Sequence, residues 1–411
     1  MSPNLALRRI ASWAVVAQLA CADTYFVAPD GDDANPGTRE QPFASVQRAQ
    51  RAASPGSTVF IRGGLYRMRA DQIAESNRLS AFAISLGTSG LPGKPIRYWA
   101  SEGERPVFDF AAVRPAGLRV SAFHAGASWL HIRGLEVVGV QVTATNHTQS
   151  ICFENAGSDN VFERLSLHDG MAIGIYGVRG SNNLFLNCDA FRNRDSVSED
   201  GRGGNVDGFG YHPGRGCTNN VFRGCRAWFN SDDGFDCINS QERVAFENCW
   251  AFFNGFSPDF KSLADGNGFK AGGYGSTAAE RLPRAIPRHV VQSCLAYRNK
   301  ANGFYGNHHP GGCDWLGNRA WGNRADFNLQ GRLADNRTEE PGRGHVLRDN
   351  VAGSEPKNMD AAACTLSGNR FGATAGRLPR ETARRIEGVL TAPRDASGAL
   401  PLLDPSWLSP E

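Results

Sequence analysis

The chain has 411 residues, of which 21% are charged, and its formal net charge is only +3. A nucleic-acid-binding protein would be expected to carry a basic stripe, and the sequence has none. The composition is neither that of a disordered chain nor that of a membrane protein, and the length is ordinary for one elongated repeat domain.

The first 22 residues have the pattern of an export signal. Arg8 and Arg9 form a basic start, a short apolar run follows, and residues 20–22 (Ala-Cys-Ala) form a cleavage site before Asp23. A buried N-terminal helix would give a similar pattern, but the run is too short to span a bilayer. We therefore predict a signal peptide at residues 1–22 and a secreted protein, extracellular or periplasmic, with no membrane segment.

Residues 23–67 predict an N-terminal module that closes one end of a repeat domain. The pattern indicates a strand and turn at residues 24–31, a helix at residues 44–53 and a further strand at residues 57–67. A solenoid must cover the open end of its core, and the amphipathic helix would serve as that cap.

A repeat becomes visible from about Ile151 onward. Its unit is a strand of β-branched or aromatic residues, a Cys or Asn, a small residue beside an aromatic one, and a terminal Asn. The terminal asparagines are Asn193, Asn230, Asn254, Asn299 and Asn323. A base unit of roughly two dozen residues with inserts of variable length is typical of a parallel β-helix, in which loops lengthen on one side without disturbing the strands. We therefore predict an all-β solenoid.

Equal positions of successive coils should stack about 4.8 Å apart, because that is the spacing of paired strands. A stacked asparagine ladder would satisfy the polar groups of buried turns, and asparagine also tolerates the left-handed conformation that turns need. Ligand contact is the alternative role for these side chains. We expect the cysteines at one repeat position to pack in the core as small apolar groups. They are Cys188, Cys225, Cys249 and Cys294.

A second register joins Gly-Phe turns to charged residues. The four turns are Asp207-Gly-Phe-Gly, Asp233-Gly-Phe-Asp236, Asn267-Gly-Phe-Lys270 and Asn302-Gly-Phe-Tyr305. Because side chains alternate along a strand, the phenylalanines should point into the core and their neighbours outward. In this alignment Asp207 stacks on Asp233, and Asp236 lies near Lys270. The charged side chains would share the outer face, where a groove could lie.

Four aspartates of this register predict a metal site. Carboxylates brought onto one patch repel one another unless a cation neutralises them. Ligands that are all oxygen, in a flexible number, favour Ca²⁺ over zinc or Mg²⁺. The alternative is a solvated acidic turn, since such residues are common in turns. The predicted ligands are Asp207, Asp232, Asp233 and Asp236.

Lys270 lies at an outward position one coil from Asp236. As a Brønsted base it would have to lose a proton from an amine whose ordinary pKa is about 10.4. A bound cation would favour the neutral amine and the carboxylates would oppose it. The alternatives are a surface lysine or a salt-bridge partner of the aspartates.

These residues match a known family. The chain resembles the pectate lyases of polysaccharide lyase family 9, which are right-handed parallel β-helices. The motif at residues 29–67 is shared by many β-helix proteins, whereas the series VDG, SDDGFD and DGNGFK between residues 206 and 270 is much more specific. The resemblance implies that the four aspartates bind Ca²⁺ and that Lys270 is the base.

The resemblance also implies β-elimination on polygalacturonate, whose C5 proton lies next to a carboxylate. We expect a monomer that acts on this anionic polysaccharide, with no nucleic-acid or membrane partner. Lys261, Arg298 and Lys300 are candidates to bind uronate carboxylates, as cationic side chains do. Each of the three is also explained as an ordinary surface charge.

Two other functions fit the same pattern. A glycoside hydrolase of polygalacturonase type would use a protonated acid and a second carboxylate, without Ca²⁺ or Lys270. A noncatalytic glycan-binding β-helix would use Ca²⁺ only for stability. Among lyase substrates, alginate and rhamnogalacturonan remain alternatives to polygalacturonate.

The predicted domain organisation follows from these patterns. Residues 23–370 form the catalytic β-helix, and residues 371–411 form a C-terminal helix and an extended tail. The helix is expected at residues 378–390, and the Pro-rich tail could lie back along the solenoid. Loss of Cys21 with the signal would leave nine of the ten cysteines, and an odd number argues against a fully paired disulfide framework.

Overall fold

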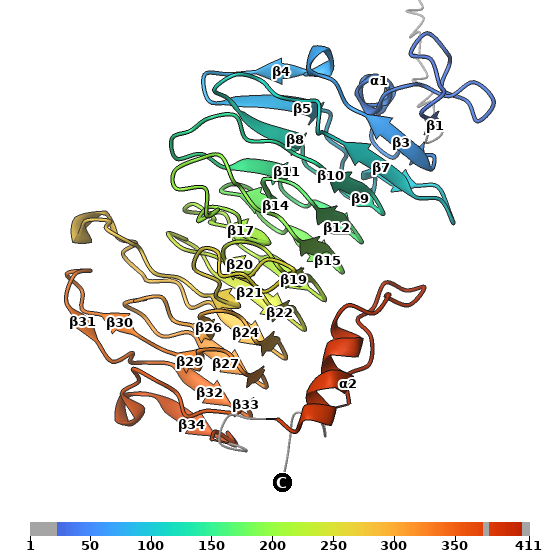
Figure 1. Ribbon diagram of the computed structural model, residues 1–411. Coiled ribbons are helices and arrows are strands. Elements are labelled where there is room, and N and C mark those ends of the chain that lie inside the picture. Colours follow the sequence, from blue (N-terminus) through green and yellow to red (C-terminus); the bar gives the residue numbers. More distant parts are fainter. Residues whose placement is uncertain (1–22, 373–377, 405–411) are drawn as a thin grey trace, which may run out of the picture.

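The computed structural model describes residues 23–372 and 378–404 and shows a solenoid of short parallel strands (Figure 1). The coils between the two ends each contribute one strand to each of three sheets, and the interior between the sheets is the hydrophobic core. The predicted parallel β-helix is therefore confirmed. The signal predicted at residues 1–22 lies outside the described residues. No helix in the described part of the chain is long and apolar enough to cross a membrane.

The first sheet has 12 strands, which pair in parallel from one end of the molecule to the other. They are β1 (Thr24–Val27), β2 (Thr58–Ile61), β6 (Ile96–Ala100), β9 (Leu130–Arg133), β12 (Val161–Glu163), β15 (Leu184–Leu186), β18 (Asn220–Arg223), β21 (Val244–Glu247), β24 (Val290–Gln292), β27 (Asp314–Leu316), β32 (Val346–Arg348) and β34 (Thr365–Ser367).

The second sheet has 10 strands and follows the first sheet in each coil. They are β3 (Gly64–Arg67), β7 (Pro106–Asp109), β10 (Glu136–Val138), β13 (Ser166–His168), β16 (Asp189–Phe191), β19 (Arg226–Trp228), β22 (Trp250–Phe252), β25 (Leu295–Tyr297), β28 (Arg319–Trp321) and β33 (Val351–Ala352).

The third sheet also has 10 strands, all parallel except β4, which pairs antiparallel with β5 at the N-terminal end. They are β4 (Glu75–Ser76), β5 (Ser80–Leu86), β8 (Arg119–Ala125), β11 (Ser150–Asn155), β14 (Ala172–Gly177), β17 (Phe209–Tyr211), β20 (Phe235–Asp236), β23 (Phe269–Lys270), β26 (Asn302–Tyr305) and β29 (Ala325–Asn328). A separate hairpin joins β30 (Gly331–Arg332) to β31 (Glu339–Glu340).

The long loops lie along both borders of the third sheet. Residues 192–208 and 253–268 connect the second sheet to the third, and residues 271–289 and 329–345 connect the third to the first. The predicted long-loop side of the solenoid is thus the outer face of the third sheet, which these loops flank. Two short 3₁₀ turns, η2 (Ala279–Arg281) and η3 (Ala361–Ala363), lie within the connections.

The predicted core columns are confirmed. Phe235 is fully buried, and its ring stacks on Phe269 at 4.7 Å and on Phe209 at 5.0 Å between centroids. The cysteines of the repeat are buried free thiols. Such stacking is repeated from coil to coil because equal positions of parallel strands lie one above the other.

The asparagine ladder is also confirmed, with one difference in its backbone. The Nδ2 atom of Asn230 donates to Oδ1 of Asn254 at 3.1 Å, and Asn254 donates to Asn299 at 3.0 Å. The left-handed conformation, however, belongs to the residue before each asparagine, with φ of 53° at Phe229 and 59° at Phe253. The residue with positive φ therefore precedes each asparagine of the ladder. The asparagine contributes hydrogen bonds, not the left-handed conformation.

A helix covers the N-terminal end of the solenoid, as the sequence predicts, and the C-terminal helix lies along the side of the solenoid. Helix α1 (Val46–Ala52) begins after Ser45, whose side chain accepts a hydrogen bond from the Arg48 amide, and it packs on the first coils. The 3₁₀ turn η1 (Ala70–Gln72) lies beside it. Helix α2 (Arg380–Leu390) is the predicted C-terminal helix. It packs across aromatic side chains of the second sheet, away from the third (Figure 1).

Candidate active site

The outward side chains of the third sheet form one column across the strands. Gly210 pairs with Asp236, Asp236 with Lys270, and Lys270 with Tyr305. The intervening phenylalanines point inward, as strand alternation requires. The predicted proximity of Asp236 and Lys270 is therefore confirmed.

Three of the four predicted metal ligands gather at the start of these strands. Carboxylate oxygens of Asp207, Asp232 and Asp233 lie within 4.8 Å of one another, and all three residues are buried. Backbone amides orient them, since Asp207 Oδ1 accepts from the Asp233 amide at 3.2 Å and Asp232 Oδ1 accepts from the Asp265 amide at 3.2 Å. The turns of successive coils thus hold the three carboxylates as one cluster, named here the acidic cluster.

Asp236 and Lys270 lie beside the acidic cluster. The Lys270 Nζ atom is 3.1 Å from Asp233 Oδ2 and 3.1 Å from Asp236 Oδ2, and the lysine side chain is only 14% exposed. The other carboxylate oxygen of Asp236 accepts from the Ile238 amide at 2.7 Å. Asp236 therefore contacts Lys270 from beside the acidic cluster. Asp233 contacts Lys270 as a member of that cluster.

Burial makes the ionised cluster unfavourable. It raises the pKa of Asp207 and of Asp232 well above the ordinary range, and repulsion from neighbouring carboxylates raises them further. Burial also raises the pKa of Asp233, although Lys270 opposes that shift. Burial alone would lower the pKa of Lys270, but the surrounding aspartates raise it well above its usual value. The Lys270 ammonium thus lies among four carboxyl groups.

The acidic cluster fits a divalent cation. Among the described residues, the buried Asp233 Oδ2 has no hydrogen-bond partner and pairs only with the Lys270 ammonium. Its Oδ1 accepts from both the backbone amide and the side chain of Asn267, at 2.6 and 2.7 Å. A donor set made only of oxygens suits a hard cation such as Ca²⁺. Asp207, Asp232 and Asp233 are the residues that could hold it.

The three predicted uronate-binding cations have other partners. Lys261 pairs with Asp259 at 2.7 Å, and its side chain is 80% exposed. Arg298 lies after β25 of the second sheet and pairs with Glu387 of α2, so it is placed away from Lys270. Lys300 donates to the carbonyls of residues 263 (2.8 Å) and 264.

A cleft borders the acidic cluster on the side of the loops that follow the second sheet. Its volume is about 440 Å³. Asp265 connects it to the cluster, because the Asp265 amide bonds to Asp232. The lining residues are Glu199, Asp200, Arg202, Gly204, Ala264, Asp265 and Lys300.

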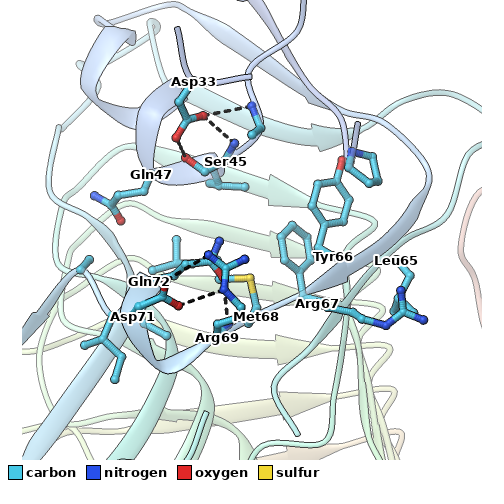
Figure 2. Close-up of a pocket in the computed structure, with 18 of the residues that line it drawn as sticks. Asp33, Ser45, Gln47, Leu65, Tyr66, Arg67, Met68, Arg69, Asp71 and Gln72 are labelled. Atoms are coloured by element: carbon cyan, nitrogen blue, oxygen red, sulfur yellow. Dashed lines mark hydrogen bonds and ion pairs between the residues drawn. The ribbon is translucent and has the colours of Figure 1, made fainter. Parts of the chain in front are cut away.

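A larger cavity, of about 560 Å³, lies under the N-terminal cap (Figure 2). Its polar groups satisfy one another: Asp33 accepts from the backbone and hydroxyl of Ser45, and Arg69 pairs with Asp71 at 3.0 Å. It is far along the solenoid from β23, which carries Lys270. Size alone therefore does not identify the site.

Sequence reasoning missed residues that support the site. Asn267 was placed in the register but not as the hydrogen-bond donor to Asp233. His212 was not singled out, although the alternation in residues 207–212 puts it on the outer face near Asp207. Its Nδ1 atom lies 2.8 Å from the Ile238 carbonyl, and burial lowers its pKa. Asn267 lies within the register of Gly-Phe turns and His212 lies two residues after the first turn, so the signal was their position relative to that register.

Comparison with known proteins decides the family. Residues 25–347 match the model described as "Pel9A-like, right handed beta helix region". The chain belongs to this family. The match confirms the hand of the solenoid and the resemblance to polysaccharide lyase family 9, and the protein is a polysaccharide lyase.

Curated relatives and solved structures agree on this assignment. Pectate lyase L of Dickeya chrysanthemi is 30% identical, with 92% of this chain and 81% of that protein aligned. Pectate lyase PEL9 of Emericella nidulans is 31% identical, with 74% of each chain aligned. A solved rhamnogalacturonan lyase is 40% identical with a TM-score of 0.88, covering 93% of this chain and 95% of that one. Pectate lyase Pel9A is 27% identical with a TM-score of 0.70, covering 94% and 89%.

Proposed function

We propose that the protein is a calcium-dependent lyase that cleaves polygalacturonate by β-elimination, with Lys270 as the base. The observation that carries this proposal is the position of the Lys270 ammonium, 3.1 Å from Asp233 and from Asp236 at the edge of the acidic cluster. A base beside a cation site suits the removal of a proton next to a carboxylate. The pectate lyases among its relatives support the substrate class.

Asp207, Asp232 and Asp233 would hold the cation, and Asp236 would complete the predicted set of four from its place beside Lys270. Bound Ca²⁺ would pair with the substrate carboxylate and stabilise the negative charge that develops beside C5. The buried Oδ2 of Asp233 supports this assignment, because within the described part of the chain it has no hydrogen bond and contacts only Lys270.

Lys270 must be neutral to act as a base. The aspartates now raise its pKa, and engagement of Asp233 by a cation would weaken that effect. The neutral Nζ atom then takes the C5 proton, and the electron pair of the C5–H bond forms the C4=C5 double bond. The C4–O4 bond breaks, and O4 takes a proton from water. Lys270 returns its proton to solvent, leaving a new chain end and a 4,5-unsaturated sugar.

Rhamnogalacturonan is the second candidate substrate. The solved rhamnogalacturonan lyase is 40% identical to this chain, compared with 27% for Pel9A. The partners of the predicted cations point the same way. Polygalacturonate carries a carboxylate on every sugar, yet Lys300 donates to backbone carbonyls and Arg298 lies against α2, which leaves Lys261 in an exposed ion pair with Asp259. A polymer that alternates charged and neutral sugars needs fewer cationic partners.

One assay separates these possibilities. Ultraviolet absorbance of unsaturated ends would be followed on polygalacturonate, rhamnogalacturonan and alginate, with Ca²⁺ or a chelator, for wild type and Lys270→Ala. We expect activity on a pectic polymer that needs both Ca²⁺ and Lys270. Cleavage without unsaturated ends would replace the lyase proposal by the hydrolase alternative. Binding without cleavage would favour a noncatalytic β-helix.

We also propose that the protein is exported through residues 1–22 and acts as a monomer. Support for export comes from the basic start, apolar run and small-residue cleavage site of the sequence. The amino-terminal sequence of the mature protein should begin at Asp23, and light scattering should give the mass of one chain.

A further inference from the structure

His212 follows β17 and presents one ring nitrogen to the outer face. Its Nδ1 atom lies 2.8 Å from the Ile238 carbonyl oxygen. A carbonyl can only accept, so Nδ1 carries the hydrogen and Nε2 of the neutral ring offers a lone pair. Among the described residues, none forms a hydrogen bond with Nε2. This atom is also not completely buried. This acceptor is therefore partly accessible to solvent.

Gly210 leaves a space in front of that acceptor. A Cβ atom on Gly210 would lie 3.1 Å from His212 Nε2, 3.3 Å from Tyr176 Cδ2 and 3.5 Å from Asp207 Oδ2. The three groups thus surround one small space, named here the Gly210 notch. The ring of Tyr176 forms one wall and packs against His212, with 5.3 Å between centroids. Any larger residue at position 210 would fill the notch.

The Gly210 notch is continuous with the active site. Gly210 is the strand neighbour of Asp236, which is in turn the neighbour of Lys270. The backbones of Gly210 and Lys270 are two strand spacings apart, but Lys270 Nζ reaches back to Asp236, the strand neighbour of Gly210. The amine and the notch are thus separated by about one strand spacing, ~5 Å, which is about the length of one pyranose ring. A group in the notch would therefore belong to a sugar next to the one that Lys270 attacks.

The chemistry of the notch selects a hydroxyl. A hydroxyl can donate to the Nε2 lone pair, whereas an ionised carboxylate has no hydrogen to donate and would face that lone pair. We propose that the Gly210 notch is a subsite for the hydroxyl edge of the sugar adjoining the attacked uronate, with His212 Nε2 accepting the hydroxyl hydrogen and Tyr176 contacting the ring. This inference rests on the proposed function and extends it to a specificity-determining residue.

Matched variants test the acceptor apart from the fold. In a full-length Lys270→Ala background, calorimetry with Ca²⁺ present would measure binding of an oligogalacturonate and of a rhamnogalacturonan oligosaccharide. His212→Asn keeps an amide donor for the Ile238 carbonyl but removes the acceptor, and it should weaken binding roughly three- to tenfold. Gly210→Ala should weaken binding at least as much. His212→Gln, which brings an amide oxygen toward the notch, should recover part of the affinity.

Two results would overturn the inference. One is oligosaccharide affinity that stays the same in His212→Asn and Gly210→Ala. The other is a loss of Ca²⁺ affinity in His212→Asn, measured by titration with Ca²⁺ alone, because it would make His212 part of the metal site. Turnover by the wild-type protein is a separate readout. Absence of unsaturated product would reject the proposed function, while the binding series would still decide the role of the notch.

Discussion

Two buried charged clusters lie on neighbouring sheets of the same coils, and they are built in opposite ways. Under α2, Asp189 is paired with Arg226 at 2.7 Å and with Arg394 at 2.5 Å. Burial alone would raise the pKa of Asp189, but the two arginines lower it. In the acidic cluster, the pKa values of Asp207 and Asp232 are raised instead.

The two clusters differ in the source of the positive charge that neutralises their carboxylates. The Asp189 cluster is neutralised by the chain itself, and Arg226 also donates to the carbonyls of Leu390 and Ala392 at the end of α2. It fastens the C-terminal helix to the second sheet. Among the described residues, the acidic cluster and the neighbouring Asp236 together pair with one lysine, Lys270, for four carboxylates, so the cluster depends on a charge from outside. A buried cluster that lacks its own counter-charges is the better candidate for function.

The largest expected effect is that of Lys270→Ala on turnover. Loss of a general base costs typically 10²- to 10⁴-fold, and the rate of formation of unsaturated ends should fall by about that factor. Circular dichroism and the thermal midpoint serve as the fold control. A variant that folds normally and keeps more than a tenth of the wild-type rate would show that another group removes the proton.

Asp233→Asn and Asp189→Asn should separate the two clusters. Asp233→Asn should abolish detectable Ca²⁺ binding in calorimetry and, with it, activity. Asp189→Asn should leave Ca²⁺ affinity unchanged but destabilise the protein by about 3–5 kcal/mol, because it leaves buried arginines without their partner. Denaturant unfolding measures that loss. Equal effects of both variants on Ca²⁺ affinity would contradict the comparison.

The pH dependence of stability should also differ between the clusters. Asp207 and Asp232 have raised pKa values in the folded state. The folded protein therefore binds more protons than the unfolded chain above about pH 4, and the contribution of these groups to stability falls as pH rises. With a chelator present, the thermal midpoint of Asp207→Asn should exceed that of wild type at pH 7 and approach it at pH 5. Saturating Ca²⁺ should reverse the order at pH 7.

The smallest effects concern Lys261 and Lys300. Lys261 forms an exposed ion pair, so Lys261→Ala should change stability by at most ~0.5 kcal/mol and leave KM within about twofold. Lys300 anchors the segment that ends at Asp265, whose amide bonds to Asp232. Lys300→Ala should weaken Ca²⁺ binding by roughly threefold, about the value of one hydrogen bond. A change in oligosaccharide affinity with unchanged Ca²⁺ affinity would instead make Lys300 a uronate contact.

The repeat, the core columns and the proximity of Asp236 to Lys270 are predictable from the amino-acid sequence. The register of Gly-Phe turns placed Phe235 inward and Asp236 beside Lys270 because strand alternation and stacking of coils are local rules. The asparagine ladder followed from the same rules. The backbone detail did not, since the left-handed residue precedes each asparagine.

The partners of the charged side chains, in contrast, depend on the tertiary fold. The sequence does not distinguish Lys300 from Arg298. Lys300 anchors a loop beside the acidic cluster, whereas Arg298 pairs with α2 on the second sheet. His212 gains its partly accessible acceptor from Ile238, one coil away. Ion pairs and hydrogen bonds depend on where loops of variable length return, and no repeat period records that length. The folded chain therefore assigns partners that the sequence leaves open.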